Sequence, residues 1–395
     1  MNARREQLLR AFALDFAPAP DFVLLPRDEV EVLASLNECA AAGIAVIPFG
    51  GGTSVVGGVE GEVGPGYRGV ASLDLRRLDR VLEVDSVSRA ARIQAGATGP
   101  GLESQLAAHG LTLRHYPQSF EFSTLGGWLA TRAGGHFATL YTHIDDLVES
   151  VRMVTPSARA AAAVLQTRRL PASGAGPAPE RLLLGSEGAF GVFTEAWLRV
   201  QARPRFRSSA SVDFADWGSA VAAVRAVSQA GLYPSNCRLL DANEAMLHGA
   251  AMTGGPVLLL GFESAEHSVE GAMARALAIV TAAPFSGSCP RGPQHRESGQ
   301  RGGDGAAESW RQAFFAAPYR QSALLSLGLL ADTFETACTW AQFPRLHAAV
   351  QLQNYQFNCH GVELDQRYTS AASSVPPVVP VRLSIAKATP RLLEP

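Results

Sequence analysis

Residues 49–58 read FGGGTSVVGG and form a glycine-rich loop directly after an apolar run at residues 44–48. The apolar run predicts a buried strand, and consecutive glycines let backbone N–H groups approach a ligand with no Cβ in the way. Thr53 and Ser54 add hydroxyl groups, which suits a loop that holds phosphate. The loop lacks the lysine of a Walker A sequence, and Val55 occupies the place of the third glycine in the dinucleotide pattern. A diphosphate that is held and not cleaved fits best, with a purely structural turn as the alternative.

The composition is that of a globular protein without a strong charge bias. At 395 residues the chain exceeds one typical hydrophobic core, so two domains are expected. Hydrophobic residues make up 47% and charged residues 18%, and the formal net charge is −2. Such a balance gives no general attraction to nucleic acid or to an anionic membrane, so no nucleic-acid partner is expected.

The five cysteines are dispersed and include no C-x-x-C pair. This spacing argues against a disulfide framework and against a zinc cluster, so we expect no metal site and a reducing, cytoplasmic location. The N-terminus, with its early charges and prolines, does not read as a signal peptide. No apolar run approaches the roughly 20 residues that a membrane-spanning helix needs.

Helix and strand signals alternate through the first half of the chain. Asp28 is expected to cap a helix that ends at Gly43, and Pro100 to start another helix. Residues 157–180, rich in alanine, arginine and proline, are expected to form a surface loop. The alternation predicts a mixed α/β domain. Strands are expected at residues 70–75, 81–84 and 91–95.

A second domain is expected from Pro204 onwards, because strand and helix signals recur there in an α+β order. A helix is expected near residues 215–230 and a buried strand at 257–262, whereas the glycine-rich residues 286–306 predict a long loop. After residue 350 the sequence has no clear period and becomes rich in serine and proline, which predicts disorder. The expected organisation is a lead-in at 1–16, a first domain at 17–203, a second and incomplete domain at 204–350, and a tail at 351–395.

Three further segments have the same character as the first loop. They lie at residues 117–128, 131–135 and 185–195, and each places small residues and hydroxyl groups beside bulky apolar side chains. Such a lining suits a long ligand that has both a polar backbone and a flat aromatic part. Four segments of this kind, far apart in sequence, are much more specific than one.

With these segments the chain resembles the FAD-binding PCMH-type flavoproteins, also called the vanillyl-alcohol-oxidase type. Within that family it is most similar to the alkylglycerone-phosphate (alkyl-dihydroxyacetone-phosphate) synthases and their bacterial FAD-linked relatives. The sequences YTHIDDLV at 141–148, CRLLD at 237–241 and FETACTW at 334–340 carry the same resemblance. It covers about residues 15–350.

The resemblance implies a fold and a cofactor. The fold is α+β, a PCMH-type FAD-binding domain of two α/β subdomains followed by an α+β substrate, or cap, domain. The cofactor is FAD, bound non-covalently, because no histidine interrupts residues 50–58 or 118–134, and nearby His136 is interpreted as an ordinary polar group. The residues that the resemblance implies for FAD binding are Gly50, Gly51, Gly52, Thr53, Ser54, Val55, Gln118, Ser119, Phe120, Glu121, Phe122, Ser123, Thr124, Gly127, Thr131, Arg132, Ala133, Gly134, Ser186, Glu187, Gly188, Gly191 and Val192.

The resemblance also implies a reaction. The synthases exchange the acyl group of acyl-dihydroxyacetone-phosphate for a fatty alcohol in ether-lipid synthesis, with no net redox change. Arg320 and Arg238 are the implied substrate-binding residues, and an arginine fork suits phosphate because it bonds bidentately. The alternatives are an FAD-linked oxidase or dehydrogenase of a 2-hydroxy acid, and a catalytically impaired flavin-binding fragment. A lipid-phosphate substrate is expected, while peripheral membrane contact and a homodimer are left open.

The C-terminal region departs from the family. Family members supply proton-transfer groups from a tyrosine and a histidine-rich segment beyond the position of Trp340. Tyr368 and His360 do not lie in a matching context, so the catalytic residues stay unassigned. The resemblance also implies a chain truncated at both ends, with an aberrant tail, that turns over poorly.

Overall fold

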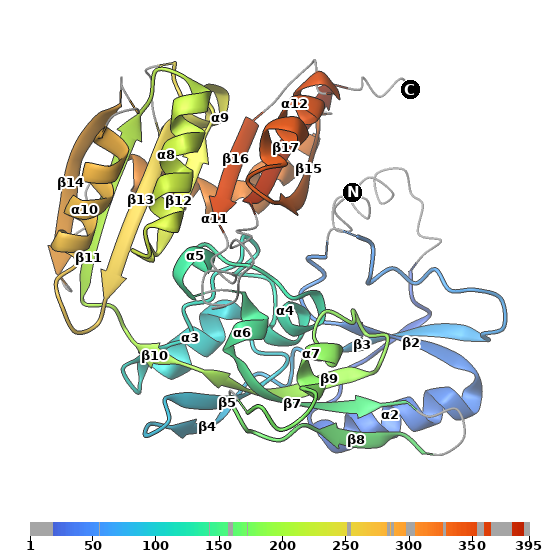
Figure 1. Ribbon diagram of the computed structural model, residues 1–395. Coiled ribbons are helices and arrows are strands. Elements are labelled where there is room, and N and C mark those ends of the chain that lie inside the picture. The colour runs from blue at the N-terminus through green and yellow to red at the C-terminus, as the bar shows by residue number, and fades with distance from the viewer. Residues whose placement is uncertain are drawn as a thin grey trace. The chain divides into compact units, whose positions relative to one another are not determined.

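The computed structural model divides into two compact units, drawn in Figure 1. The chain passes from the first unit to the second between Arg203 and Pro204, and residues 136–142 group with the second unit. The residues that the structure describes are 19–54, 56–141, 143–156, 161–171, 173–250, 254–282, 285, 288–297, 305–326, 329–353, 359–364 and 381–390.

The first unit begins with a parallel sheet covered by one helix. The sheet has the order β1-β3-β2, from β1 (Phe22–Leu24), β2 (Ile44–Phe49) and β3 (Gly69–Asp74). Asp28 is the N-cap of helix α2 (Glu29–Ala42), and its carboxylate accepts a hydrogen bond from the Glu31 N–H at 2.9 Å. It ends at Gly43, which adopts φ 68°. Both predicted caps are therefore confirmed.

The second sheet of the first unit is antiparallel and has five strands in the order β4-β5-β9-β7-β8. Its core side chains, among them Ile93, Leu102 and Trp128, pack between the sheet and helices α3 and α4. Val154 and Val192 join the core formed with α2, so this helix packs on both sheets of the unit. The remaining elements of the first unit, in which β6 and β10 pair with each other, are β4 (Val81–Asp85), β5 (Ala90–Gln94), α3 (Gly99–Ala107), β6 (Leu111–Thr112), α4 (Leu125–Thr131), α6 (Ile144–Leu147), β7 (Val148–Thr155), β8 (Ala163–Gln166), α7 (Pro179–Leu183), β9 (Val192–Arg199) and β10 (Gln201–Ala202).

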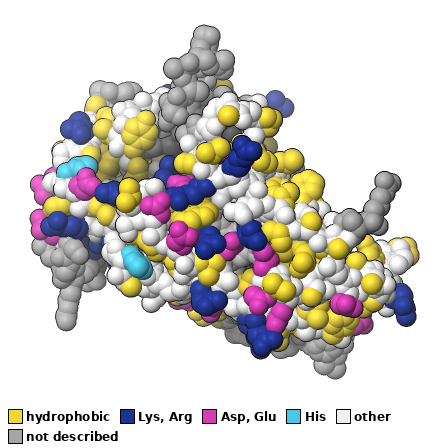
Figure 2. All heavy atoms as spheres, turned by 90° about the horizontal axis from the view of Figure 1, so that it is seen from below, with side chains coloured by type: hydrophobic (Ala, Val, Ile, Leu, Met, Phe, Trp, Pro, Cys, Tyr) yellow, Lys and Arg dark blue, Asp and Glu magenta, His cyan; other side chains and the backbone are white. Residues whose placement is uncertain are grey.

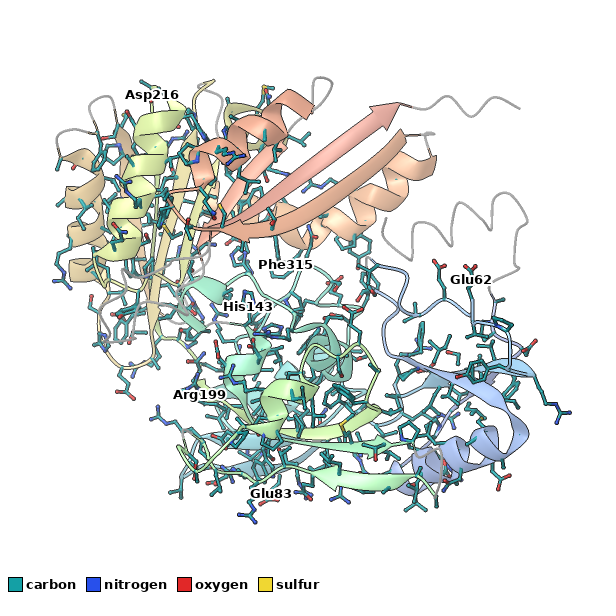
Figure 3. The ribbon with its side chains drawn as sticks, turned by 45° about the vertical axis from the view of Figure 1, so that its right-hand side comes forward. Glu62, Glu83, His143, Arg199, Asp216 and Phe315 are labelled. Atoms are coloured by element: carbon teal, nitrogen blue, oxygen red, sulfur yellow. The ribbon has the colours of Figure 1, made fainter. Side chains whose placement is uncertain are left out.

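The second unit is built on a seven-stranded sheet in the order β14-β11-β13-β12-β16-β17-β15. Helix α8 starts at Asp216, labelled in Figure 3, whose carboxylate accepts a hydrogen bond from the Ser219 N–H. The strands are β11 (Phe206–Asp213), β12 (Asn236–Leu240), β13 (Val257–Ser264), β14 (Cys289–Glu297), β15 (Leu329–Cys338), β16 (Cys359–Leu364) and β17 (Val381–Pro390). The helices are α5 (Ala138–Tyr141), α8 (Trp217–Gln229), α9 (Ala242–Leu247), α10 (Glu270–Thr281), α11 (Ala306–Ser326) and α12 (Phe343–Gln353).

Both faces of the seven-stranded sheet are covered by helices. Along β13, Leu258 and Leu260 belong to the core with α8 and α10, while Val257 and Leu259 belong to the core that contains Trp310 of α11. This alternation is the period of a strand buried on both faces. Strand β12 alternates in the same way, and its Arg238 lies under the Trp310 ring on the α11 face.

Three segments differ from the loops or disorder expected of them. Strand β8 lies within residues 157–180, and β14 lies within residues 286–306. β14 is an edge strand, and its pairing with β11 contains one irregularity. A sequence with Pro290 can still form a strand there, because proline is tolerated at the edge of a sheet. In the expected tail, β16 pairs with β12 and β17 pairs with β15. Residues 381–386, VRLSIA, alternate apolar and polar in most positions, a strand signal hidden behind the proline-rich stretch.

The surface carries mixed charge. On the face drawn in Figure 2, positive and negative side chains are interspersed and form no large patch of one sign. Among the described helices, none combines the length and hydropathy needed to cross a bilayer.

Candidate functional site

The first two glycine-rich segments pack directly against each other in the first unit. A Cβ on Gly51 would overlap the Phe122 carbonyl and lie 2.9 Å from the Cα of Ser123. A Cβ on Gly50 would overlap the hydroxyl of Thr124. Glycine is therefore required here so that the backbone of the first loop can touch the backbone of residues 122–123 and the side chain of Thr124.

The other two segments join the same region. The N–H groups of Gly185 and Glu187 donate to the carbonyls of Leu129 and Ala130, each at 3.0 Å. A Cβ on Gly58 would lie 3.8 Å from Oε2 of Glu187, in ordinary contact. The structure thus brings together the four segments that the sequence predicted as one site.

The convergence depends on unusual backbone conformations. Arg132 (φ 52°) and Glu187 (φ 50°) are in the left-handed region, which costs free energy for residues with a side chain. Arg132 ends α4, and its N–H donates to the Trp128 carbonyl. Such strain is typical of functional loops and favours a site here.

Free backbone donors remain in the first loop. The N–H groups of Gly51, Gly52 and Thr53 form no hydrogen bond with another described residue, and these residues are half-buried. The buried hydroxyl of Ser186, in the fourth segment, also has no partner within the described ranges. Unpartnered donors in glycine loops fit an anionic group such as the diphosphate of FAD.

Several residues predicted to contact the cofactor make side-chain contacts within the fold. Ser123 donates its hydroxyl to the Ser119 carbonyl at 2.9 Å and accepts from the Trp128 Nε1–H at 2.7 Å. The Arg132 guanidinium pairs with the buried carboxylate of Asp145 at 2.7 Å. The side chain of Val192 is in the core, as described above.

Two more of the predicted residues support the fold, and a third lies outside the described residues. A Cβ on Gly191 would overlap the Val154 carbonyl, so this glycine allows β9 to approach β7. Thr131 donates its hydroxyl to the Gly127 carbonyl at 2.9 Å, within α4. Val55 lies outside the described residues.

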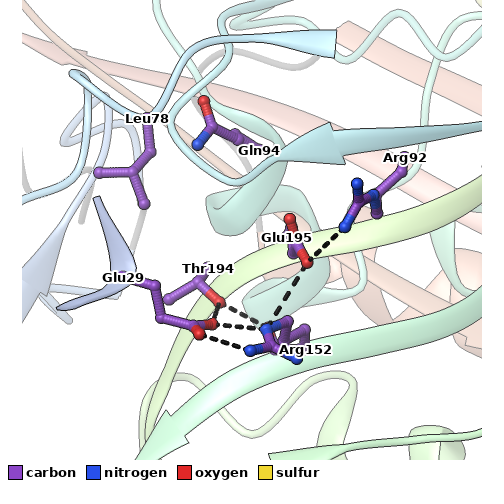
Figure 4. Close-up of a pocket in the computed structure, with 7 residues that line it drawn as sticks. All are labelled: Glu29, Leu78, Arg92, Gln94, Arg152, Thr194 and Glu195. Atoms are coloured by element: carbon purple, nitrogen blue, oxygen red, sulfur yellow. Dashed lines mark hydrogen bonds and ion pairs between the residues drawn. The ribbon is translucent and has the colours of Figure 1, made fainter. Parts of the chain in front are cut away.

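A separate cavity of about 300 Å³ in the first unit is lined by charged residues (Figure 4). Arg152 pairs with Glu29 at 2.7 Å and lies 3.6 Å from Glu195. Burial opposes ionisation of Glu29, but hydrogen bonds from Arg152 and Thr194 bring its pKa below the ordinary value. The cavity contains none of the predicted cofactor residues, and its ion pairs tie α2 to the five-stranded sheet.

In the second unit, the two predicted arginines lie in one partly buried polar cluster on the α9 and α11 face of the sheet. Arg238 is 6% exposed, and its guanidinium lies 5.0 Å from the Trp310 ring centre and 5.3 Å from that of Phe314. Arg320 donates to Nδ1 of His248 at 2.9 Å and to the Ala313 carbonyl at 2.6 Å. The charges of both arginines act on His248, which places them near the same imidazole.

The cluster also contains residues that the sequence did not reveal. Burial, with the charges of Arg320 and Arg238, lowers the pKa of His248 to about 4. Burial, with the charge of Asp241, raises the pKa of Glu244 to about 8 against the opposing charge of Arg238. Glu244 lies in the first turn of α9 and His248 is its C-cap, four residues later, and this spacing was the available signal.

His136 is held within the second unit. Its ring is 4% exposed, and its Nε2 lies 3.0 Å from Nδ2 of Asn236. It also packs 5.3 Å from the ring centre of Phe314. The structure gives one ring nitrogen of His136 a partner, and the interpretation of this residue as an ordinary polar group stays a prediction.

Comparison with known proteins gives the class. Residues 20–161 match an FAD binding domain, and residues 203–359 match the C-terminal domain of FAD linked oxidases. The chain therefore combines an FAD-binding domain of the PCMH type with an FAD-linked oxidase C-terminal domain, as the resemblance implied.

Within that class, the chain is homologous to alkyldihydroxyacetonephosphate synthases. The enzyme of Dictyostelium discoideum is 38% identical over 229 residues, which cover 58% of this chain and 36% of that protein. The enzyme of Trypanosoma brucei brucei is 29% identical over 364 residues, covering 86% and 58%. A solved alkyldihydroxyacetonephosphate synthase has a TM-score of 0.78 and 27% identity, covering 96% of this chain and 70% of that one. The chain thus spans about a third to three-fifths of the length of these two curated relatives.

Proposed function

We propose that this protein binds FAD non-covalently in the first unit. The observation that carries the proposal is the convergence of four glycine-rich segments around the unpartnered N–H groups of residues 51–53. These groups would hold the diphosphate, and the Ser186 hydroxyl would supply a further donor. The absence of a histidine from residues 50–58 and 118–134 supports an untethered flavin.

We propose further that the second unit binds a phosphate-bearing lipid precursor, as the names of the homologous synthases suggest. The reaction would replace the acyl group of acyl-dihydroxyacetone-phosphate by a fatty alcohol. Bound oxidised flavin supplies an electron sink for such chemistry. Among the described residues, Arg320 donates only to His248 and the Ala313 carbonyl, and a guanidinium has five N–H groups, so within the described structure donors remain for a phosphate. Arg238 would add a second positive charge.

A second candidate function is the oxidation of a 2-hydroxy acid. The match of residues 203–359 to FAD linked oxidases favours it, and a carboxylate would use the same arginines. Anaerobic addition of D-lactate would bleach the flavin of such an oxidase, whereas a redox-neutral synthase would keep its yellow colour.

The test of substrate binding uses two arginines of the same helix. Arg320→Leu should keep bound FAD and weaken binding of dihydroxyacetone phosphate by at least about tenfold, or 1.4 kcal/mol. Arg311→Leu is the matched control, because Arg311 is exposed and pairs with Glu308 at 2.6 Å. Loss of FAD with unchanged phosphate affinity in Arg320→Leu would reverse the assignment.

The proposed setting is the cytoplasm. Cys39, Cys237, Cys289 and Cys338 are free thiols in the described part of the chain, which suits a reducing compartment. A lipid substrate would bring the protein to a membrane surface peripherally, and flotation with vesicles tests this. Sedimentation of the purified protein tests the homodimer.

A further inference from the structure

Residues 74–76 lie beside the first glycine-rich loop, at the carboxyl end of the parallel sheet. The loop begins at Phe49, the last residue of β2, and Asp74 is the last residue of the neighbouring strand β3. Phe49 and Asp74 are register partners, and the Leu75 N–H donates to the Phe49 carbonyl at 3.0 Å. Ligands of open α/β sheets bind outside the carboxyl ends of the strands, so residues 74–76 border the proposed diphosphate site.

The side chain of Phe49 connects this border to the loop. A Cβ on Gly52 would lie 2.9 Å from Cε2 and 3.0 Å from Cζ of the Phe49 ring, so the ring fills the space next to the Gly52 Cα. Gly52 adopts φ 61°, in the left-handed region that glycine enters readily. Phe49 therefore packs against the turn that carries the N–H groups of residues 51–53, which donate to no described residue.

Arg76 lies on the same ring and is itself held in place. Its guanidinium carbon is 5.6 Å from the centre of the Phe49 ring. Asp74, which is 4% exposed, accepts from the Arg76 backbone N–H at 3.0 Å and from Nη2 at 2.6 Å. Nε of Arg76 also donates to this carboxylate, at 3.0 Å and 3.1 Å from its two oxygens. The buried carboxylate thus holds the planar guanidinium in one orientation beside the ring.

We propose that Arg76, held by Asp74, is a positioning residue of the FAD site, because it keeps the Phe49 ring against Gly52 and so keeps the first loop in the shape that binds the diphosphate. The inference rests on the proposed binding of FAD by this loop. Arg76 and Asp74 lie outside the four glycine-rich segments, and the resemblance implied no role for them. Since Arg76 acts through the ring, its effect on FAD binding should disappear when the ring is removed.

The charge of Arg76 does not carry the inference. The Asp74 carboxylate lies 2.6 Å away and offsets this charge, so the pair adds little net attraction for a diphosphate. Nη1 of Arg76 donates to no described residue, and a direct hydrogen bond from Nη1 to FAD is the competing explanation. The experiment must therefore separate an effect through Phe49 from a contact with the cofactor.

The experiment measures the affinity of the full chain for FAD by fluorescence titration, in a double-mutant cycle. Arg76→Gln should weaken FAD binding about two- to fivefold, which corresponds to one cation–π contact at an exposed site. Phe49→Leu should weaken it further, because the loop loses the whole ring. In the Phe49→Leu background, Arg76→Gln should have no additional effect.

The neighbouring arginine is the matched control. Arg77 has the same charge, is also exposed, and donates its Nη1 to the Leu25 carbonyl at 3.3 Å. Arg77→Gln should leave FAD affinity unchanged. Thermal unfolding of the flavin-free protein should be the same for Arg76→Gln and Arg77→Gln, so that weaker FAD binding does not reflect a general loss of fold. Arg76→Lys keeps a cation for the ring and should recover part of the affinity.

A second cycle tests the ion pair even if Phe49→Leu does not fold. Asp74→Asn should weaken FAD binding to the same degree as Arg76→Gln, because each releases the guanidinium from its position over the ring. Combining the two substitutions should add nothing to either one. Losses that add up would show that Asp74 does not act by holding Arg76.

The outcomes separate the inference from the proposed function. Arg76→Gln that binds FAD as tightly as wild type would overturn the role of Arg76. An equal loss from Arg76→Gln in wild type and in Phe49→Leu would also overturn it, because Arg76 would then act independently of the ring. Wild type that binds no FAD would instead overturn the proposed cofactor site, and the inference with it.

Discussion

The glycine-rich region of the first unit and the polar cluster of the second unit are built in opposite ways. The first is made from backbone: glycines let loops touch, and N–H groups are the free donors. The second is made from side chains, with Arg238, Glu244, His248 and Arg320 brought from three elements to one face of a sheet. A site made from backbone can be predicted from the local sequence, because few residues can replace glycine. A cluster of side chains cannot, because it depends on tertiary packing.

The largest expected effect comes from removing the C-terminal strands of the second unit. Deletion of residues 354–395 would remove β16 and β17, leave β12 with a free edge and leave β15 with no partner strand. The second unit should lose cooperative unfolding, while the first unit stays folded. Limited proteolysis with mass spectrometry would show a stable fragment ending near Arg203.

The control for this deletion is a chain that ends at Pro390 and keeps both strands. A deletion of residues 354–395 that melts as sharply as this control, with the second unit still protected, would show that β16 and β17 do not support the sheet.

A smaller effect is expected from one glycine of the first loop. Gly51→Val places its side chain into the Phe122 carbonyl, so the first two segments must separate. FAD affinity should fall by at least about tenfold, or 1.4 kcal/mol. Gly58→Ala is the control, since its Cβ meets only ordinary contacts at 3.7 Å and 3.8 Å. Fluorescence titration with FAD measures both, and equal affinities would place the diphosphate elsewhere.

A graded effect is expected in the second unit, where the polar cluster makes stability depend on pH. For Glu244, the folded pKa of about 8 lies above the ordinary 4.5, so its contribution is complete below pH 4.5 and is lost as the pH rises through 8. For His248, the folded pKa of about 4 lies below the ordinary 6.5, so its contribution is present above pH 6.5 and is lost towards pH 4. Of these two groups, only Glu244 acts between pH 6.5 and 8.

In that window the free energy of unfolding should fall by up to about 1.4 kcal/mol per pH unit through Glu244. Urea denaturation at pH 6.5, 7.25 and 8 measures the slope. Glu244→Gln should flatten it, and an unchanged slope in that variant would show that Glu244 does not titrate there.

Much of the first unit could be predicted from the sequence. Asp28 and Gly43 mark the ends of α2 by capping chemistry that depends on neighbouring residues alone, and the loop at 49–58 follows its strand as expected. The same local signals failed for β14, because an edge strand with Pro290 is stabilised by its partner β11 and not by its own propensity.

The second site was only half predictable. Arg238 and Arg320 came from the family resemblance, while Glu244 and His248 gave only a helical spacing that any surface pair could show. Their significance comes from burial, which the pattern of α9 alone does not reveal. Similarly, cofactor contacts were expected for Ser123 and Val192, and the sequence did not indicate that neighbouring elements would contact these side chains.

The central claim is that the four converging segments hold FAD without a covalent bond. The most direct measurement is the absorbance spectrum of the purified protein, followed by acid precipitation. We predict a flavin spectrum of about one FAD per chain, with all yellow colour released to the supernatant. Colour retained in the pellet would contradict non-covalent binding, and a colourless protein that takes up no added FAD would contradict the whole account.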